Sequence, residues 1–415
     1  MFGTVKYIGN GNIYYDVIEW NGILYSFHGF VDELFVKSKF IGIVSGGDNS
    51  LFSITSAYSV VDDTDNEYLI IMHWNIMTDF YLFKKMPNFD EFASLYNFNE
   101  KQNDSDKVSP NTVSEMCSIV GYIPNKSDNR IIVALIDTGV YPHHEITEPL
   151  NRVIMSIDLV NGFSEMYDDN GHGTAMAGII TANGYKDDNL RGVSATTDII
   201  SIKAYDYQGR GSVDTVIDAI EWVVSNKNVY DIKIIHLSFG LDFTSDPIKS
   251  KELISAVERA YDEGLLIVTA VGNLHGQSAI YVPANSEKVL AVGSSNIDIN
   301  TFEHCFVSEF TSYWKNETGY FKPDIIAPGE NIEVLGSYIY FLPDGKLSGR
   351  IVQNKVLSGT SVSAALVTGI VADIWSENPN LSNTEIFSMI KKHTYTIDYN
   401  EQSFSHISFR DNIDK

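Results

Sequence analysis

Between residues 131 and 292, short and nearly uninterrupted runs of apolar residues recur along the chain. Such runs are typical of strands that are buried on both faces of a sheet. Between two of them, from Val213 to Val224, apolar residues return at the spacing of one helix face. This alternation predicts a parallel sheet covered by helices, with functional residues beyond the carboxyl ends of its strands. The expected strands are Ile131–Ile136, Ile199–Ala204, Ile232–Leu237, Leu265–Ala270 and Val289–Val292.

Residues 1–98 follow a different pattern, in which short strand-like segments are separated by turn residues. Since 415 residues is also long for a single core, we expect two domains. We predict an α/β fold with a parallel sheet sandwiched by helices at 112–415, a polar linker at 99–111 and a smaller β-rich domain at 1–98. In the small domain we expect strands at Asn12–Ile18, Ile23–Phe27, Leu51–Tyr58 and Tyr68–His73, and a helix at Phe89–Tyr96.

The chain is strongly acidic, with 54 acidic and 29 basic residues and a formal net charge of -25. Nucleic acid and anionic lipid surfaces repel such a chain, so we predict neither nucleic acid nor membrane as a partner. The first residues lack the basic and apolar regions of a secretory signal, and no apolar run is long enough for a membrane-spanning helix. We therefore predict a cytoplasmic protein, and a secreted one only if the natural start lies upstream.

Three short motifs together contain the residues of an activated serine nucleophile. Asp137 ends an apolar run, His172 lies between two glycines, and Ser361 opens a segment of small and apolar residues. Each motif alone has a structural explanation, as a turn, a helix start and a helix cap. All three in one chain are difficult to explain by structure alone.

The chemistry of a serine nucleophile explains why these residue types belong together. A serine hydroxyl becomes reactive when a neutral imidazole accepts its proton, and a buried carboxylate orients that imidazole and stabilises its charged form. At a helix N-terminus the serine also has backbone N–H groups and the positive end of the helix dipole beside it. We therefore predict Ser361 as nucleophile, His172 as general base and Asp137 as the residue that orients His172.

The segments around these residues resemble the three signatures of the subtilisin-like serine proteases, or subtilases. They are Asp137-Thr138-Gly139, Gly171-His172-Gly173-Thr174 and Gly359-Thr360-Ser361-Val362-Ser363-Ala364-Ala365. Their order is that of the family, and the resemblance extends over about residues 112–392, including the stretch Lys322–Gly329. It implies a serine endopeptidase that forms an acyl-enzyme on Ser361, with Asn273 and the Ser361 N–H binding the oxyanion.

The resemblance also implies how a substrate binds. Subtilases hold an extended peptide or protein segment as an added strand between two edge segments, here Gly209-Arg210-Gly211 and Ser238-Phe239-Gly240. The pocket for the side chain at the cleaved position corresponds to 238–240, 270–272 with Gly272, and Tyr281, which is expected to shorten it. These residues include no carboxylate, so we expect no strict requirement for lysine or arginine. Arg210 either favours an acidic residue upstream of the bond or is a solvated loop residue.

The chain departs from the family pattern at three places. In the loop Asn183–Asn189, where many subtilases bind a structural calcium, Lys186 lies near an expected ligand. We therefore predict no metal site and no cofactor for the chemistry. A structural calcium stays open as an alternative that the sequence does not support: Asp187 and Asp188 either serve a remodelled site or, as we favour, belong to a solvated acidic turn. The stretch between Gly329 and Ser361 is extended, with an expected hairpin around 343–345. The tail 395–415 lacks the family's glycine-rich closing segment, which leaves its packing open.

Several alternatives stay open at this level. The domain 1–98 is an inhibitory prosegment, a structural partner, or a retained regulatory or substrate-recruiting domain; we favour the last, because a cytoplasmic endopeptidase has to be kept from bystander proteins. The enzyme is either selective for one peptide or protein, which the extra domain and extended stretch favour, or a general turnover protease. The competing hypothesis is a catalytically silent binding module. The presence of all four predicted reactive residues argues against it.

Overall fold

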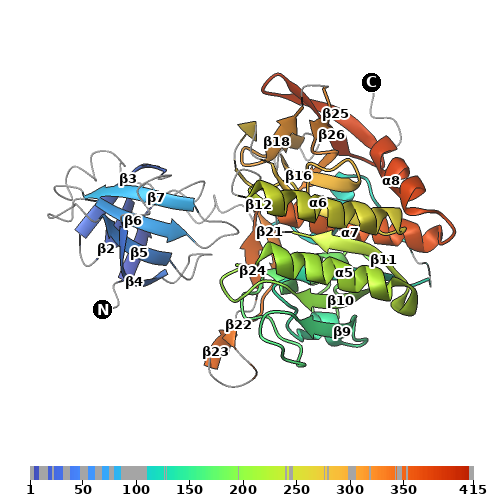
Figure 1. Ribbon diagram of the computed structural model, residues 1–415, viewed down its shortest axis with the longest axis horizontal. Coiled ribbons are helices and arrows are strands. Elements are labelled where there is room, and N and C mark those ends of the chain that lie inside the picture. Colours follow the sequence, from blue (N-terminus) through green and yellow to red (C-terminus); the bar gives the residue numbers. More distant parts are fainter. Residues whose placement is uncertain are drawn as a thin grey trace. The chain divides into compact units, whose positions relative to one another are not determined.

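The computed structural model describes residues 110–410 with short gaps, and the backbone of the strands within residues 1–109. The gaps lie at 126, 128, 195, 239–240, 243–245, 275, 278–279, 298–304, 317–318, 342, 344–347 and 352–353. The chain forms two compact units, Met1–Ser109 and Pro110–Lys415 (Figure 1). Most of the predicted linker 99–111 lies outside the described residues.

The first unit is a closed barrel with the strand order β1-β2-β3-β7-β6-β5-β4. Its strands are β1 (Thr4–Ile8), β2 (Val17–Trp20), β3 (Ile23–Phe30), β4 (Ser38–Gly46), β5 (Thr55–Val60), β6 (Tyr68–His73) and β7 (Asp79–Lys85). Neighbouring strands are antiparallel except β1 and β4, whose parallel pairing closes the barrel. Strands β3, β5 and β6 overlap expected ones, whereas most of Asn12–Ile18 and the expected helix Phe89–Tyr96 lie outside the described residues.

The second unit is built around a mostly parallel sheet with the order β25-β26-β20-β16-β13-β11-β8-β10-β9. Its centre overlaps the five predicted runs: β8 (Ile131–Asp137), β10 (Thr197–Lys203), β11 (Ile232–Leu237), β13 (Leu266–Ala270) and β16 (Val289–Ile297). These strands are apolar because both faces of the sheet are buried. The sheet is extended by β9 (Val153–Asp158) on one side, by β20 (Ile325–Pro328) on the other, and by β17 (Cys305–Val307) beside β16.

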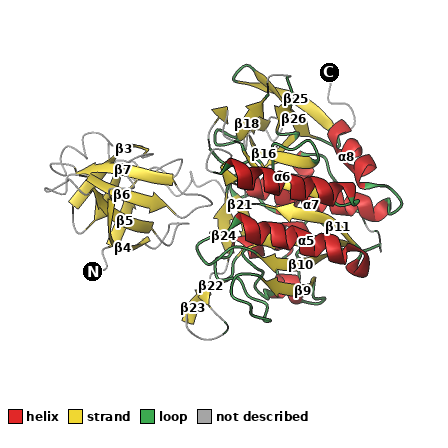
Figure 2. Cartoon of the chain, viewed as in Figure 1, coloured by secondary structure: helices red, strands yellow, loops and turns green. Residues whose placement is uncertain are grey.

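Helices cover both faces of this sheet (Figure 2). Helices α5 (Val213–Tyr230) and α6 (Pro247–Asp262) pack against each other, as do α4 (His172–Thr181) and α7 (Thr360–Glu377). Helix α7 carries small and apolar residues on all sides, because it is buried along almost its whole length. The predicted α/β sandwich is therefore confirmed.

Shorter elements complete the second unit. The other helical segments are α2 (Val113–Ile119), α3 (His144–Thr147), α8 (Asn383–Lys392) and the 3-10 turn η3 (Asp188–Leu190). Small sheets are formed by β12 (Leu241–Asp242) with β15 (Tyr281–Val282), by β14 (Gly276–Gln277), β18 (Ser312–Lys315) and β19 (Phe321–Lys322), and by β21 (Ile332–Leu335) with β24 (Asn354–Leu357). Strands β22 (Tyr338–Phe341) and β23 (Ser348–Ile351) form a hairpin where one was predicted.

The tail, whose packing the sequence left open, extends the sheet. Strands β25 (Thr394–Tyr399) and β26 (Gln402–Ile407) form a hairpin, and β26 pairs with β20 in parallel. Phe404 is buried in a small apolar cluster with Val307, Tyr313 and Ile326. The tail up to residue 410 is thus an integral part of the second unit.

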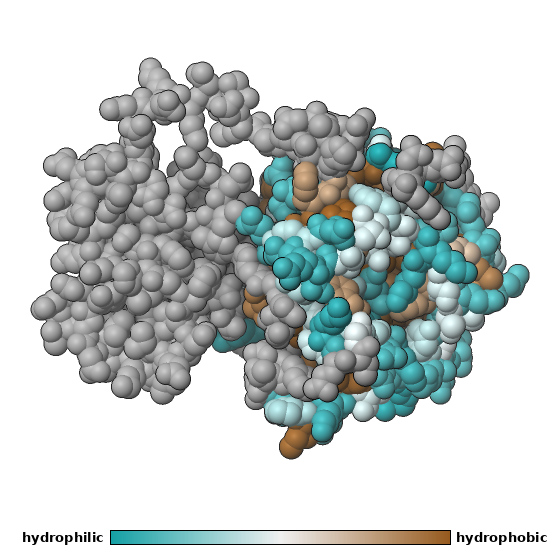
Figure 3. Space-filling model, turned by 90° about the horizontal axis from the view of Figure 1, so that it is seen from above, coloured by the Kyte–Doolittle hydropathy of each residue, from teal (hydrophilic) through white to brown (hydrophobic). Residues whose placement is uncertain are grey.

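Figure 3 shows one face of the molecule, on which hydrophilic side chains of the second unit are interspersed with smaller hydrophobic areas. Within the described part of the chain, the large hydrophobic side chains that are more than half exposed are Ile123, Tyr185, Val229, Ile248 and Phe306. They come from different elements, and single exposed hydrophobic residues are ordinary on a folded protein. Among the described helices, none combines the length and the apolar character that crossing a membrane requires.

Candidate active site

Neighbouring strands bring the predicted site residues to one edge of the sheet. Asp137 is the last residue of β8 and lies in register with Lys203, the last residue of β10. Ser238 directly follows β11, and Asn273 lies just beyond the end of β13. The carboxyl ends of parallel strands are the usual place for a functional site in this kind of sheet.

Asp137 and His172 form a buried pair. His172 is the first residue of α4, and its Nδ1 atom lies 2.8 Å and 3.0 Å from the two carboxylate oxygens of Asp137. The Thr138 N–H donates a further hydrogen bond of 2.7 Å to the same carboxylate. The two motifs approach closely because residue 173 is glycine: a Cβ atom on Gly173 would overlap the carbonyl oxygen of Gly139. With Nδ1–H donated to the carboxylate, Nε2 is the nitrogen that can accept a proton.

Asp168, which the sequence analysis did not single out, joins these two motifs. Its Oδ1 accepts hydrogen bonds from Thr138 Oγ1 at 2.9 Å and from the Gly171 N–H at 2.8 Å. Its Oδ2 accepts from the N–H and the Oγ1 of Thr174 at 2.9 Å and 2.6 Å. Because the carboxylate is fully buried, these bonds fix the loop that leads into α4. The available signal was an acidic residue four positions before His172.

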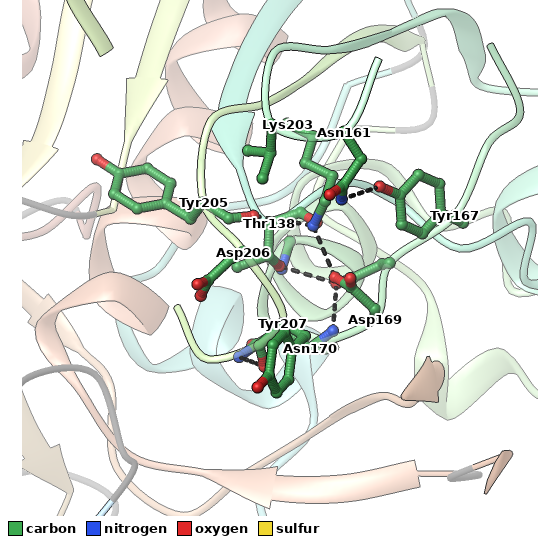
Figure 4. Close-up of polar contacts among 12 residues, drawn as sticks. Thr138, Asn161, Tyr167, Asp169, Asn170, Lys203, Tyr205, Asp206 and Tyr207 are labelled. Atoms are coloured by element: carbon green, nitrogen blue, oxygen red, sulfur yellow. Dashed lines mark hydrogen bonds and ion pairs between the residues drawn. The ribbon is translucent and has the colours of Figure 1, made fainter. Parts of the chain in front are cut away.

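Lys203 and Asp169 form a buried ion pair beside the same loop (Figure 4). Lys203 Nζ lies 2.6 Å from Asp169 Oδ1 and donates to the carbonyl oxygens of Thr138 and Tyr205 at 2.7 Å and 2.8 Å. Burial raises the pKa of Asp169 to about 6, although the charge of Lys203 opposes this shift. The ion pair therefore supports the backbone directly after Asp137. A charged residue inside an apolar run was the sequence signal for Lys203.

Ser361 and Asn273 face the same small space. Ser361 is the second residue of α7, so the backbone N–H groups and the positive dipole end of this helix lie beside it. Thr360 orients Asn273 by donating from its N–H and Oγ1 to Asn273 Oδ1, at 2.9 Å and 3.0 Å. A Cβ atom placed on Gly359 would lie 3.3 Å from Ser361 Oγ and 3.4 Å from Asn273 Nδ2. Ser361 Oγ is buried and has no hydrogen-bond partner among the described residues.

His236 links the segment after β11 to the helix that carries Ser361. Its Nδ1 lies 2.8 Å from Thr368 Oγ1 on α7, and its Nε2 is hydrogen-bonded to Ser238 Oγ. Burial lowers the pKa of His236 to about 3, and the nearby His172 contributes to the shift. His236 was not predicted as a site residue, because it lacks the spacing that is typical of metal ligands.

The buried histidines predict a loss of stability in mild acid. Burial lowers the pKa of His236 to about 3 and that of His406 to about 4, whereas an unfolded histidine titrates near pH 6.5. Below pH 6.5 the unfolded chain therefore binds more protons, and each of the two histidines lowers the free energy of unfolding by about 1.4 kcal/mol per pH unit. Urea unfolding at pH 7.5 and pH 5 measures this slope. The slope should be smaller in His236→Asn, and an equal slope would contradict the assignment.

The Arg210 side chain forms an ion pair with Asp206, a residue of the same turn. Its Nε and Nη2 atoms donate to Asp206 Oδ2 at 3.1 Å and 2.9 Å, and the Asp206 N–H donates to the Arg210 carbonyl oxygen at 2.9 Å. This ion pair supports the interpretation of Arg210 as a solvated loop residue. Gly209 and Gly211 lie in the same turn, and Gly211 packs against Tyr205.

Tyr281 covers Gly272, because a Cβ atom on this glycine would overlap the Tyr281 ring. The ring is buried, and the Tyr281 N–H donates to the Val271 carbonyl oxygen at 3.1 Å. Tyr281, Gly272 and the segment after β13 are therefore brought together as the sequence predicts. Ser238 is buried beside His236, whereas Phe239 and Gly240 lie outside the described residues.

Backbone N–H groups of the loop 183–189 donate hydrogen bonds to the Glu145 carboxylate. Glu145 is fully buried and accepts hydrogen bonds from the N–H groups of Tyr185, Lys186 and Asp187, the last two at 2.9 Å and 3.1 Å. The positive ends of these N–H dipoles converge on the Glu145 carboxylate. Nowhere in the described ranges do three or more acidic, histidine or cysteine side chains gather into a candidate metal site.

Comparison with known proteins agrees with this geometry. The subtilase family model matches residues 128–407, so the chain belongs to the subtilase family. The solved structure of Sphericase shares 27% sequence identity with a TM-score of 0.54, covering 68% of this chain and 89% of that one. The family predicted from the three motifs is thereby confirmed. The first unit lies outside the family match.

Two relatives come from Bacillus subtilis (strain 168). Serine protease AprX is 35% identical over 273 residues, which span 64% of this chain and 61% of that protein. Minor extracellular protease Epr is 36% identical over 169 residues, which span 40% of this chain and 24% of that protein. The chain thus matches less than two thirds of either relative. The name of Epr describes an extracellular protein and lends no support to a cytoplasmic location, which stays a prediction.

Proposed function

We propose that the chain is a serine endopeptidase in which Ser361 is the nucleophile, His172 the general base and Asp137 the residue that orients His172. The observation that carries this proposal is the buried contact of 2.8 Å between His172 Nδ1 and Asp137, at the sheet edge where Ser361 lies at a helix start. Membership of the subtilase family and relatives named as proteases support the same class of reaction.

The proposed function implies the following sequence of steps. His172 Nε2 accepts the proton of Ser361 Oγ as this oxygen attacks the carbonyl carbon of the peptide bond, and Asp137 stabilises the imidazolium. Asn273 Nδ2 and the Ser361 N–H bind the oxyanion that develops. His172 then donates its proton to the leaving amine, and an acyl-enzyme remains on Ser361. Water, activated by His172, hydrolyses this ester and regenerates the hydroxyl.

A fluorophosphonate probe tests the proposal directly, because it reacts covalently with an activated serine. We expect one equivalent of label, on the peptide that contains Ser361, and hydrolysis of an unstructured protein such as casein. Labelling should be lost in His172→Ala, because that variant lacks the base. Correctly folded protein that neither binds the probe nor cleaves casein would support the competing hypothesis of a silent binding module.

Removing the Asn273 amide is expected to lower kcat by about 10²–10³-fold with little change in KM. The magnitude is the one known for subtilisin, and the physical reason is the loss of a donor that acts mainly on the transition state. Asn273→Leu and wild type should be compared by steady-state hydrolysis of a peptide substrate. Asn226→Leu, on α5, is the control and should keep wild-type kcat. If Asn273→Leu kept the kcat of wild type, Asn273 would not be part of the oxyanion hole.

The substrate we propose is an extended peptide or protein segment, paired as a strand with residues 209–211 and 238–240. Tyr281 fills space beside Gly272, which supports a preference for a small side chain at the cleaved position over lysine or arginine. The ion pair between Arg210 and Asp206 argues against a selective acidic subsite. Cleavage of a mixed peptide library would measure both preferences. A narrow sequence profile would indicate selective processing, which we favour, and a broad one general turnover.

We further propose that the fold requires no calcium at the loop 183–189. The three backbone N–H groups that converge on Glu145 supply the positive potential that a cation would otherwise provide. Excess EDTA is therefore expected to leave the melting temperature unchanged within about 2 °C. A shift of that size corresponds to only a small change in the free energy of unfolding. A fall of more than about 10 °C that calcium reverses would show a structural calcium.

For residues 1–98 we propose a retained regulatory or substrate-recruiting domain. Within the second unit, Asn111 pairs with the backbone of Asn331 and Glu333, and Tyr122 Oη donates to Asp373 at 2.6 Å. Because these contacts tie the chain to the second unit from Asn111 onward, removal of the first unit would require a cut before Asn111. Intact mass of purified wild type and Ser361→Ala tests the proposal. Full-length protein in both would support retention, and loss of about 110 residues only in wild type would indicate a self-cleaved prosegment.

A further inference from the structure

The stretch between Gly329 and Ser361 lies against the segment that leads into His172. Strands β21 and β24 pair along this stretch, and a Cβ atom on Gly178 of α4 would lie 2.8 Å from the Leu335 side chain. Beyond β21, the buried Ser337 Oγ donates a hydrogen bond to the Asp168 carbonyl oxygen. Part of this stretch, at Leu335 and Ser337, is therefore packed on the His172 helix and its entry loop.

Lys355 makes a further contact between the same two parts of the chain. It lies on β24, six positions before Ser361, and its Nζ donates a hydrogen bond of 3.0 Å to the carbonyl oxygen of Gly171. Gly171 is the residue directly before His172 and has a left-handed backbone with φ of 97°, which glycine adopts readily. One side chain thus joins the strand that leads to Ser361 to the residue that precedes His172.

Charged groups surround the Lys355 contact. Burial lowers the pKa of the Lys355 amine, while the charges of Asp168 and Asp137 oppose this shift. The Asp168 carboxylate is itself hydrogen-bonded within the loop that leads into α4. The positive charge of Lys355 is therefore attracted to the same loop whose carbonyl oxygen it contacts.

We propose that Lys355 is a positioning residue, which holds the loop before His172 against the strand leading to Ser361. This inference rests on the proposed endopeptidase function of the same site. Lys355 donates to a backbone carbonyl, so its effect on the reaction passes through the position of His172.

Replacing Lys355 by methionine removes both the donor and the charge at similar length. We expect kcat/KM of Lys355→Met for a peptide substrate to fall by about 10- to 100-fold, as loosened alignment of reacting groups predicts. The fall should lie in kcat, with KM little changed, because Lys355 contacts the backbone before His172 and no residue proposed to bind substrate. Lys355→Arg should restore most of kcat, since it keeps a donor to the Gly171 carbonyl oxygen. Lys251→Met, at an exposed position of α6, is the matched control and should behave as wild type.

NMR signals of the loop separate this inference from the proposed activity. In the Ser361→Ala background, the backbone amide signals of Gly171 and His172 should shift in Lys355→Met and stay unchanged in Lys251→Met. Lys355→Gln, which keeps a donor, gives the same test with smaller shifts if Lys355→Met does not fold. Unchanged amide signals and an unchanged kcat in an active enzyme would overturn the role of Lys355. Absence of hydrolysis by wild type would instead refute the proposed function.

Discussion

Replacing Ser361 by alanine is expected to lower kcat by about 10⁶-fold and to abolish fluorophosphonate labelling, while the protein still folds. The magnitude is the one known for subtilisin, where the nucleophile and its base act as a unit. The hydroxyl removed here is buried at the start of α7 and has no hydrogen-bond partner in the described part of the chain. Its loss therefore deprives the reaction of its nucleophile but leaves no partner group unsatisfied.

Ser363→Ala is the matched control, two positions later on the same helix. The Ser363 hydroxyl donates to the Ala327 carbonyl oxygen at 2.9 Å, so its removal should lower the free energy of unfolding by about 1 kcal/mol and leave labelling intact. Both variants should be compared by labelling, by steady-state hydrolysis and by urea unfolding. Labelling that persists in Ser361→Ala, or that is lost only in Ser363→Ala, would assign the nucleophile elsewhere.

Replacing Lys203 by methionine is expected to lower the free energy of unfolding by about 3–5 kcal/mol. The change leaves the Asp169 carboxylate buried without its counter-ion, and it removes donors from the carbonyl oxygens of Thr138 and Tyr205 (Figure 4). Because Thr138 directly follows Asp137, kcat should also fall. Urea unfolding of the intact chain at pH 7.5 measures the first effect, and steady-state hydrolysis measures the second.

The double variant Lys203→Met/Asp169→Leu distinguishes an unpaired charge from lost packing. Removing both charges should recover part of the stability, because no uncompensated carboxylate then remains in the interior. Recovery should be incomplete, since the carbonyl oxygens of Thr138 and Tyr205 still lack their donor. A double variant as unstable as the sum of the two single variants would show that the pair does not act through its charges.

The sheet of the second unit was predictable because its strands are buried on both faces. Burial on two sides demands continuous apolar runs such as Ile131–Ile136 and Ile232–Leu237, and these are visible without knowledge of the partners. The pair of Asp137 and His172 was predictable for a different reason. The activation of a serine requires a carboxylate, an imidazole and a hydroxyl together. The small residues around them indicate that the segments carrying these groups pack closely against one another.

Residues that act through distant backbone contacts were not predictable in the same way. Lys355 contacts Gly171 from 184 positions away, and a lone lysine before Ser361 gives no sign of such a contact. The tail was left open because its pairing with β20 depends on a long-range register. Arg210 was left undecided, since only the structure shows that Asp206 binds its side chain.

The order of strands across the sheet has a consequence for synthesis of the chain. Strand β8, which carries Asp137, is among the first of the second unit to be made, whereas Ser361 and the pairing of β26 with β20 come near the end. A nascent chain on the ribosome therefore carries the proposed base and its carboxylate well before Ser361 has been made. Contacts over such long separations also form slowly. In the proposed mechanism, peptide-bond cleavage is thus withheld until Ser361 has been synthesised and α7 can fold.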